Sequence, residues 1–348
     1  MLQKIPLHEG FLFGRDGFFL DDTGSPIVLF GVREFDLFWT HLDTLFESPM
    51  GRKLIYAGTD AEELILSAHK DFQLPRFFGV KKVTERLHNR WIAMGWGLHS
   101  TQKNLITMPC HDAWSVGLAL AHKEHLTQER WTMSWSQRSS EHVDLHFEPK
   151  AASIASAQVP RPLNWGAAET STSIQGELDL ELEARSYGFF RGQQRSFFMH
   201  VSAFHHLFNS IIGRPLVGQH PWMKDWVIEG ASSSEVELFS SVSRAAMMAF
   251  QQSETPIFVQ QSSDWAELFN IHISHRGLGH VAIQSSVFDG EESTEFSIKS
   301  NLPALTCGLL AGMFERAHGQ HAMMNITIHP SNVVMNLSFP SVDYVVKT

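Results

Sequence analysis

The sequence predicts an α+β protein made of two tandem copies of one domain, each with N-terminal helices and an antiparallel sheet crossed by a helix. Three observations predict this fold class. Four short blocks of sequence recur in the same order in both halves of the chain. Apolar residues at helical spacing fill the earlier part of each half. Alternation with a period of two, which is typical of strands, fills the later part.

The repeat is carried by blocks whose offset changes in one direction only. The matched residues are 17–19 and 188–190, 48–58 and 220–230, 95–98 and 277–280, and 114–149 and 305–340, and the offset grows from 171 to 191. Chance gives single short matches, but it rarely gives four in order. Insertions in the second copy explain the growing offset, and the polar turn at residues 289–294 is one of them.

The repeat also divides the chain into domains. We place the first domain at residues 1–149 and the second at residues 176–348. The linker between them, residues 150–175, is rich in Ala, Ser, Thr and Pro, as connecting segments usually are. Two diverged copies in one chain predict an intrachain pseudo-dimer, and they leave a homodimer open.

The early elements of each copy follow from residue spacing. Alternating apolar and polar residues predict an opening strand at residues 10–13 and at residues 176–183. Apolar residues three and four positions apart then predict a series of helices. These helices are expected over residues 34–46 and 203–212, 48–58 and 220–230, 61–69 and 234–246, and 87–94.

The later elements are clearest in the second copy. Residues 280–288 and 295–299 predict a hairpin. A helix is expected over residues 305–317, with Pro303 near its start and Gly319 near its end. Residues 322–329 and 333–339 predict two closing strands around a turn at residues 330–332.

Composition excludes several classes of protein. The net charge is -10, with -3 in residues 1–150 and -7 in the remainder, so neither half has the basic excess of a nucleic-acid-binding protein. The two cysteines, Cys110 and Cys307, have no CxxC spacing. No signal peptide and no apolar run of about 20 residues is present. We expect a cytoplasmic protein without a membrane span.

Four glycines are candidates for close approach to a ligand. Gly95 and Gly97 follow a predicted helix, and Gly277 and Gly279 are their matches in the second copy. Glycines at such a place more often supply a positive φ angle at a helix-to-strand turn. We favour this structural interpretation and assign no cofactor-binding residue.

Histidine pairs are the candidate metal ligands, because side chains three residues apart share one face of a helix. The pairs are His122 with His125, His272 with His275, and His318 with His321. They are not equivalent between the copies, and no acidic residue completes a site. We therefore expect no metal and no cofactor.

The adjacent residues Cys110, His111 and Asp112 contain the groups of a nucleophile, a base and an orienting acid. Such partners meet through the fold and not through adjacency in sequence. No phosphate-binding loop, dinucleotide fingerprint or hydrolase elbow is present either. We assign no catalytic residue.

One family resemblance emerges from these motifs. Residues 95–97 (Gly-Trp-Gly) after a helix, a hairpin, residues 307–315 (Cys-Gly-Leu-Leu-Ala-Gly-Met-Phe-Glu) and two closing strands resemble the vinyl-reductase-type, or hydrocarbon-binding, domain. Residues 51–58 (Gly-Arg-Lys-Leu-Ile-Tyr-Ala-Gly) are similar to that family's pattern too. This family shares its fold with sensing domains of phenol-responsive activators and with vesicle-tethering subunits. The resemblance covers most of both copies.

The resemblance implies a pocket between helices and sheet for a small apolar molecule, and pairing of the domains. Several ligand-sensing members carry a cysteine-rich zinc site near the closing strands. Here the matching segments, residues 128–147 and 321–339, contain no cysteine. This departure puts a metal in doubt.

Three functions stay open on this evidence. The first is a non-enzymatic sensory or regulatory protein that binds a small hydrophobic ligand and acts through a protein partner, and it predicts a closed apolar cavity. The second is a scaffold or assembly subunit with filled pockets, and it predicts an exposed apolar patch. The third, an enzyme, predicts titratable groups with shifted pKa values in a cleft. We favour the first, since no output domain is evident and the interior is rich in Phe and Met.

Overall fold

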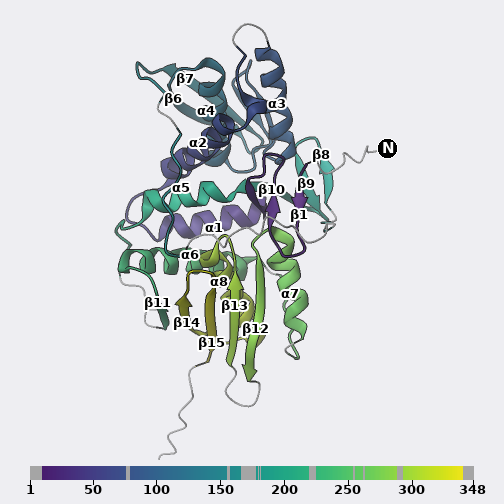
Figure 1. Cartoon of the computed structure of the whole chain (residues 1–348), viewed down its shortest axis with the longest axis vertical. Helices are drawn as coiled ribbons and strands as arrows, with labels where there is room; N and C mark the ends of the chain where they lie inside the picture. The colour runs from purple at the N-terminus through teal and green to yellow at the C-terminus, as the bar shows by residue number, and fades with distance from the viewer. Residues whose placement is uncertain are drawn as a thin grey trace, which may run out of the picture. The chain divides into compact units, whose positions relative to one another are not determined.

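The computed structural model describes residues 10–75, 79–154, 157–165, 178, 180, 182–218, 225–253, 255–261, 263–287 and 293–339. Its helices and sheets confirm the α+β class (Figure 1). The chain forms two compact units. The first unit contains residues 1–36, 48–161 and 174–211, and the second contains residues 37–47, 162–173 and 212–348. The domain boundaries predicted from the sequence repeat, residues 1–149 and 176–348, stay a prediction.

A six-stranded antiparallel sheet in the first unit combines strands from both halves of the sequence (Figure 1). Its order is β1 (Leu12–Phe13), β2 (Phe19–Leu20), β3 (Pro26–Gly31), β10 (Gln194–His200), β9 (Gly188–Arg191), β8 (Glu183–Arg185). The predicted strand at residues 176–183 lies mostly outside the described residues, and β8 begins at its last residue. Helix α1 (Val32–Thr44) follows β3, and helix α5 (Val201–Ile211) follows β10.

The register of the two central strands is symmetric. Ile27 pairs with His200, and Gly31 pairs with Ser196. An offset of 169 residues converts Ile27 into Ser196 and Gly31 into His200. A twofold axis between β3 and β10 would produce this register.

The rest of the first unit is a helical layer and a four-stranded antiparallel sheet. The helices are α2 (Gly51–Ala68), η1 (Lys70–Phe72), α3 (Val80–Ala93) and α4 (Asp112–Thr127). The sheet order is β4 (Leu98–Ser100), β5 (Leu105–Thr107), β7 (His142–Pro149), β6 (Trp131–Ser139). Helices α2 and α4 pack closely because Gly117 lacks a side chain: a Cβ there would lie 2.3 Å from Ile55 O.

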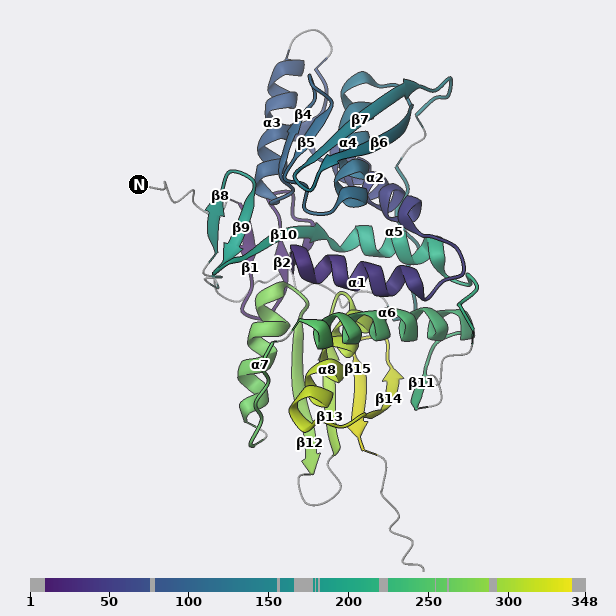
Figure 2. The ribbon, with the colours of Figure 1, turned by 180° about the vertical axis from the view of Figure 1, so that it is seen from behind.

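The second unit repeats this arrangement with one added strand (Figure 2). Its elements are β11 (Trp226–Glu229), α6 (Ser233–Gln252), α7 (Asp264–His272), η3 (Ser274–Arg276), β12 (His280–Val287), β13 (Ser293–Lys299), α8 (Pro303–His318), β14 (Met323–Ile328) and β15 (Val333–Ser338). The sheet order is β11-β14-β15-β13-β12. Without β11, this is the order β6-β7-β5-β4 of the first unit. Pro303 begins α8 and Gly319, at φ +67°, caps it, as predicted.

The predicted helix at residues 220–230 is wrong where the structure describes it. Residues 226–229 form β11, which pairs in parallel with β14. The sequence Trp-Val-Ile has the bulky and β-branched side chains that strands favour. Gly230, at φ +93°, ends the strand, and the helix starts only after Ser232, whose capping box with Glu235 fixes the first turn. In the first copy, residues 54–58 are helical within α2, as expected. The block that matches residues 48–58 with 220–230 therefore pairs a helix with a strand, and the structural counterpart of α2 is α6.

Equivalent glycines occupy equivalent turns in the two units. Gly97 has φ +102° and Gly279 has φ +106°. A Cβ would lie 2.3 Å from Met108 O at the first and 2.1 Å from Lys299 O at the second. These are positive-φ turn positions, as the structural interpretation of the sequence predicts. Gly308 likewise packs where Gly117 does, since a Cβ on it would lie 2.1 Å from Ser243 O.

A matching hydrogen bond fixes the alignment of the closing strands. Glu124 Oε1 accepts a hydrogen bond of 2.8 Å from Trp131 N, and Glu315 Oε1 accepts one of 3.0 Å from Ala322 N. Donor and acceptor are seven residues apart in both units, at an offset of 191. Shared topology and shared contacts support the duplication inferred from the sequence. Within the described ranges, no helix has the length and apolar character needed to cross a membrane.

Candidate functional site

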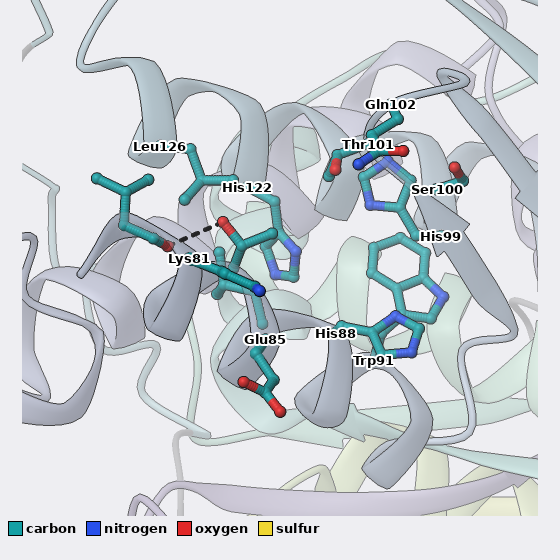
Figure 3. A pocket seen from close by; sticks show the side chains of 13 residues that line it. Lys81, Glu85, His88, Trp91, His99, Ser100, Thr101, Gln102, His122 and Leu126 are labelled. Carbon is teal, nitrogen blue, oxygen red and sulfur yellow. Dashed lines mark hydrogen bonds between the residues drawn. The ribbon is translucent and has the colours of Figure 1, made fainter. Parts of the chain in front are cut away.

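The candidate site is a cavity of about 810 Å³ in the first unit (Figure 3). It lies between α3, the β4–β5 turn and α4. Its walls mix apolar, hydroxyl and imidazole side chains, so it differs from the closed apolar cavity expected from the family resemblance. The lining residues are Val80, Lys81, Thr84, Glu85, Leu87, His88, Trp91, His99, Ser100, Thr101, Gln102, His122 and Leu126.

Two polar atoms in the wall have no protein partner. The rings of Trp91 and His99 lie 4.8 Å apart between centroids. Trp91 Nε1 and His99 Nε2 are buried, and neither has a hydrogen-bond partner among the described residues. Because buried polar atoms are nearly always paired in folded proteins, a hydrogen-bonding group of a ligand would satisfy these two atoms once a small movement of the wall exposes them to the cavity.

His99 is held in its neutral form. Burial, with smaller contributions from the charges of His122 and His88, lowers the pKa of His99 to about 3. A neutral imidazole has one nitrogen that donates and one that accepts. Together with the Trp91 indole, which only donates, the wall therefore offers a donor beside a group that can accept.

His122 connects the cavity to a buried ionic cluster. Its Nε2 atom lies 3.0 Å from Glu62 Oε1, so its other ring nitrogen is the one left for the cavity. Arg90 Nε donates to the same Glu62 oxygen at 2.9 Å. Arg90 belongs to α3, Glu62 to α2 and His122 to α4, so the contact joins all three helices.

We use the name ionic cluster for Asp21, Glu62, Arg90, His122 and His200. Arg90 Nη1 lies 3.1 Å from Asp21 Oδ2, and Arg90 Nη2 lies 2.9 Å from His200 Nε2. His200 Nε2 also lies 3.0 Å from Asp21 Oδ2. The side chains of all five residues are at most 2% exposed. The cluster thus ties the end of β10 and the β2–β3 turn to the three helices.

Both carboxyl groups of the cluster stay ionised. Burial alone would raise the pKa of Asp21, but the hydrogen bond and charge of His200 and the charge of Arg90 outweigh it and hold the pKa well below its usual range. Burial is likewise outweighed at Glu62, where Arg90 and His122 lower the pKa. Two carboxylates and one guanidinium leave one negative charge among these three groups.

The second unit carries apolar residues at the corresponding positions. Val281 follows Gly279 at the distance at which His99 follows Gly97, and Met313 follows Gly308 at the distance at which His122 follows Gly117. Both replacements are buried. Phe250 takes the place of Glu62 and Ile273 that of Trp91, whereas His272, at the position of Arg90, is the one polar residue in this set.

Aromatic packing fills this region of the second unit. Trp265 stacks on Phe314 with ring centroids 6.1 Å apart, and on Phe269 at 5.8 Å. Phe269 also meets Phe296 at 5.8 Å. The polar cavity wall and the ionic cluster are therefore features of the first copy, and the second copy has an apolar interior at these positions.

The structure separates the histidine pairs singled out in the sequence. His122 contacts Glu62, whereas His125 Nε2 lies 2.7 Å from Phe72 O. His318 ends α8, and His321 Nδ1 lies 2.7 Å from Glu315 Oε1. Within the described ranges, no group of three metal-ligating side chains comes together.

Cys110, His111 and Asp112 form a helix start. His111 is the N-cap of α4, and its Nδ1 accepts a hydrogen bond of 3.5 Å from Trp114 N. Burial raises the pKa of the Cys110 thiol to about 11 and lowers the pKa of His111 to about 4. A buried thiol that stays protonated at neutral pH is a poor nucleophile, so the geometry favours a structural role.

Sequence reasoning missed Trp91, His99 and most of the ionic cluster. A signal was present for two of these residues. Glu62 and Arg90 stand on the buried faces of their helices, in α2 beside Ala61 and Ile65 and in α3 beside Leu87. A charged residue on an apolar helix face predicts a buried charged partner.

Comparison with known proteins yields no relative for this chain, because no protein-family model, no curated protein and no solved structure matches it significantly.

The neutral state of His99 predicts that acid destabilises the fold. As the pH falls below about 6.5, the unfolded chain takes up a proton at this residue, whereas the folded chain does not until the pH nears 3. The unfolded state then binds more protons, so the free energy of unfolding decreases between pH 6.5 and 3. Urea denaturation at pH 7 and pH 5 should show a smaller decrease for His99→Val than for the wild type.

The exposed His146 provides the control. His146→Gln should keep the wild-type pH dependence. If His99→Val shows the full wild-type decrease as well, His99 is not the buried neutral imidazole described above.

Proposed function

We propose that this protein binds one small molecule per chain in the cavity of the first unit and works as a non-enzymatic sensory or regulatory protein of the cytoplasm through a protein partner. One observation carries the proposal: Trp91 Nε1 and His99 Nε2 belong to residues that line the cavity, and both atoms are buried with no hydrogen-bond partner among the described residues. A ligand that supplies their hydrogen bonds would remove the cost of leaving two buried polar atoms unpaired.

The wall limits the chemistry of the ligand. Leu87, Leu126 and the Trp91 ring offer apolar contact, which suits a compact apolar body. One hydroxyl group on that body can accept from Trp91 and donate to His99. We therefore infer a small apolar molecule with a single hydroxyl or carbonyl group, and not an unsubstituted hydrocarbon.

The resemblance to the hydrocarbon-binding domain fits this proposal and stays a prediction. If the chain is a tandem pair of such domains, the copies have divided their roles. The first copy keeps a polar cavity, and the second has exchanged His99 and His122 for Val281 and Met313. The alternative function, a scaffold with filled pockets, draws its support from the second copy alone.

A second candidate is proton-transfer catalysis in the same cavity. It is favoured by the contact between His122 and Glu62, since a carboxylate that orients an imidazole at a cavity wall is an arrangement used for general bases. This candidate predicts that His122→Gln abolishes turnover of a bound compound but leaves its affinity nearly unchanged.

Binding of matched compounds to the purified protein tests the proposal. A panel of small aromatic alcohols and phenols would be compared with the hydrocarbons of the same shape by calorimetry and thermal shift. We expect the hydroxyl compounds to bind, and His99→Val to weaken their binding by about tenfold, the value of one lost hydrogen bond. The control variant His146→Gln should bind like the wild type.

The residues of the second copy sharpen this test. His99→Val and His122→Met install the side chains that stand at the matching positions of the second unit, so both variants should fold. Equal affinity of wild type and His99→Val for every compound, or no binding across the panel, would contradict the proposal.

A further inference from the structure

We propose that the free edge of β6 is a docking site for an extended segment of a partner protein, which adds to the four-stranded sheet as a parallel strand. The segment has acidic residues flanking large apolar ones. This proposal rests on the proposed function only in its need for a protein partner. The surface is separate from the lining of the ligand cavity.

Strand β6 ends the sheet order, and no strand within the described ranges pairs with its outer edge. A groove of about 510 Å³ runs beside this edge, between α2, α4 and β6. Trp131, Met133 and Trp135 alternate along the strand, so they share one face, and all three line the groove. Trp135 is 38% exposed, which leaves a large apolar side chain uncovered.

In the second unit, the corresponding edge strand, β14, is paired with an additional strand. There β11 pairs in parallel with β14, with Trp226 opposite Met324 and Ile228 opposite Ile326. The counterparts of Met133 and Trp135 at the offset of 191 are Met324 and Ile326.

Covering the edge changes the burial of these positions. Met324 is 0% exposed and Ile326 is 2% exposed beneath their additional strand, whereas Trp135 is open. The first copy therefore has the apolar face of a covered edge without the strand that covers it.

The backbone N–H groups of β6 are placed for the same parallel pairing that joins β11 to β14. Met324 N donates a hydrogen bond of 3.0 Å to Asp225 O, just before β11. Since Met133 is the counterpart of Met324, its N–H should point to the open side of β6. An exposed edge of this kind is the acceptor surface for strand addition.

The charged residues that line the groove indicate which residues should flank the apolar ones in the added strand. Arg52 and Lys150 line the groove, and no ion pair with either is recorded within the described ranges. Arg130 is neutralised by Glu63 and Glu124. The remaining acid is Asp60, whose pKa is raised by burial, and the two cations outnumber it. Two unpaired cations favour an acidic segment, and β11 itself follows Asp225 and ends on Glu229.

The test uses a peptide with the sequence of residues 225–232 (Asp-Trp-Val-Ile-Glu-Gly-Ala-Ser) as the probe. Fluorescence anisotropy would measure its binding to the full chain, with a scrambled peptide for comparison. We expect saturable binding that Trp135→Lys weakens by about tenfold or more, because a lysine at an edge blocks pairing and removes the aromatic anchor. Ser136→Lys adds the same charge outside the groove and should bind like the wild type.

Thermal unfolding of both lysine variants would establish that they remain folded, since both positions are exposed. Equal binding of the two variants, or no binding of the peptide to the wild type, overturns the proposal. So does a concentration-dependent dimer in sedimentation that Trp135→Lys dissociates, because the occupant would then be a second copy of this chain. Peptide binding and ligand binding are tested independently, because His99→Val should bind the peptide like the wild type. Peptide binding can therefore be observed even if no ligand binds in the cavity.

Discussion

Replacement of Arg90 by methionine is expected to lower the free energy of unfolding by about 3–5 kcal/mol. Arg90 is buried between Glu62 and Asp21, at 2.9 Å and 3.1 Å. Without the guanidinium, two carboxylates would stay in the interior with imidazole partners and, for Asp21, the hydrogen bonds from Thr23 and Ser25. Breaking a buried ion pair at one side costs this much because the remaining charge cannot reach water. Urea denaturation at pH 7 measures the loss.

Arg86, one turn earlier on α3, is the matched control. It pairs with Asp71, but the two side chains are 37% and 48% exposed. Arg86→Met should therefore cost at most about 1 kcal/mol. The double variant Arg90→Met with Glu62→Leu should recover part of the loss, since it removes one uncompensated charge. A loss below 1 kcal/mol for Arg90→Met would contradict the buried ionic cluster.

The second large effect is expected at the crossing of α2 and α4. Gly117→Ala would place a methyl group 2.3 Å from Ile55 O, and a backbone atom cannot move aside as a side-chain end can. We expect a loss of about 1–3 kcal/mol or more, the range for overpacked cores. Gly308→Ala should cost a similar amount in the second unit, because its methyl group would lie 2.1 Å from Ser243 O.

Gly51→Ala is the control for this prediction. Gly51 begins α2 and has nothing within 4 Å of an added Cβ, so alanine should be neutral or should stabilise the helix slightly. Thermal unfolding of the three variants would compare them directly. The close packing of the helix pairs is wrong if Gly117→Ala unfolds at the same temperature as Gly51→Ala.

Local sequence signals predicted most of the helices, and the hairpin in residues 280–299, correctly. Pro303 and Gly319 marked the ends of α8 because proline and glycine act through their own backbone angles. Gly97 and Gly279 were assigned to turns for the same reason. These features depend on a few neighbouring residues, so a single sequence contains them.

Features that depend on distant residues were missed. The strand β11 was taken for a helix, since its conformation is set by pairing with β14 about 100 residues later in the sequence. The contact between Asp21 and His200 spans 179 residues. The neighbourhood of Trp91 and His99 likewise exists only after α3 has packed on β4. Spacing in the sequence does not contain such contacts.

If only the first copy binds a ligand, each chain should carry one small molecule. Native mass spectrometry of the freshly purified chain, with organic extraction of the bound material, measures this. We expect one small molecule per chain, absent from His99→Val, with an apolar body and one hydroxyl or carbonyl group. Two molecules per chain, or an empty protein that shows no thermal shift with any compound of the panel, would contradict it.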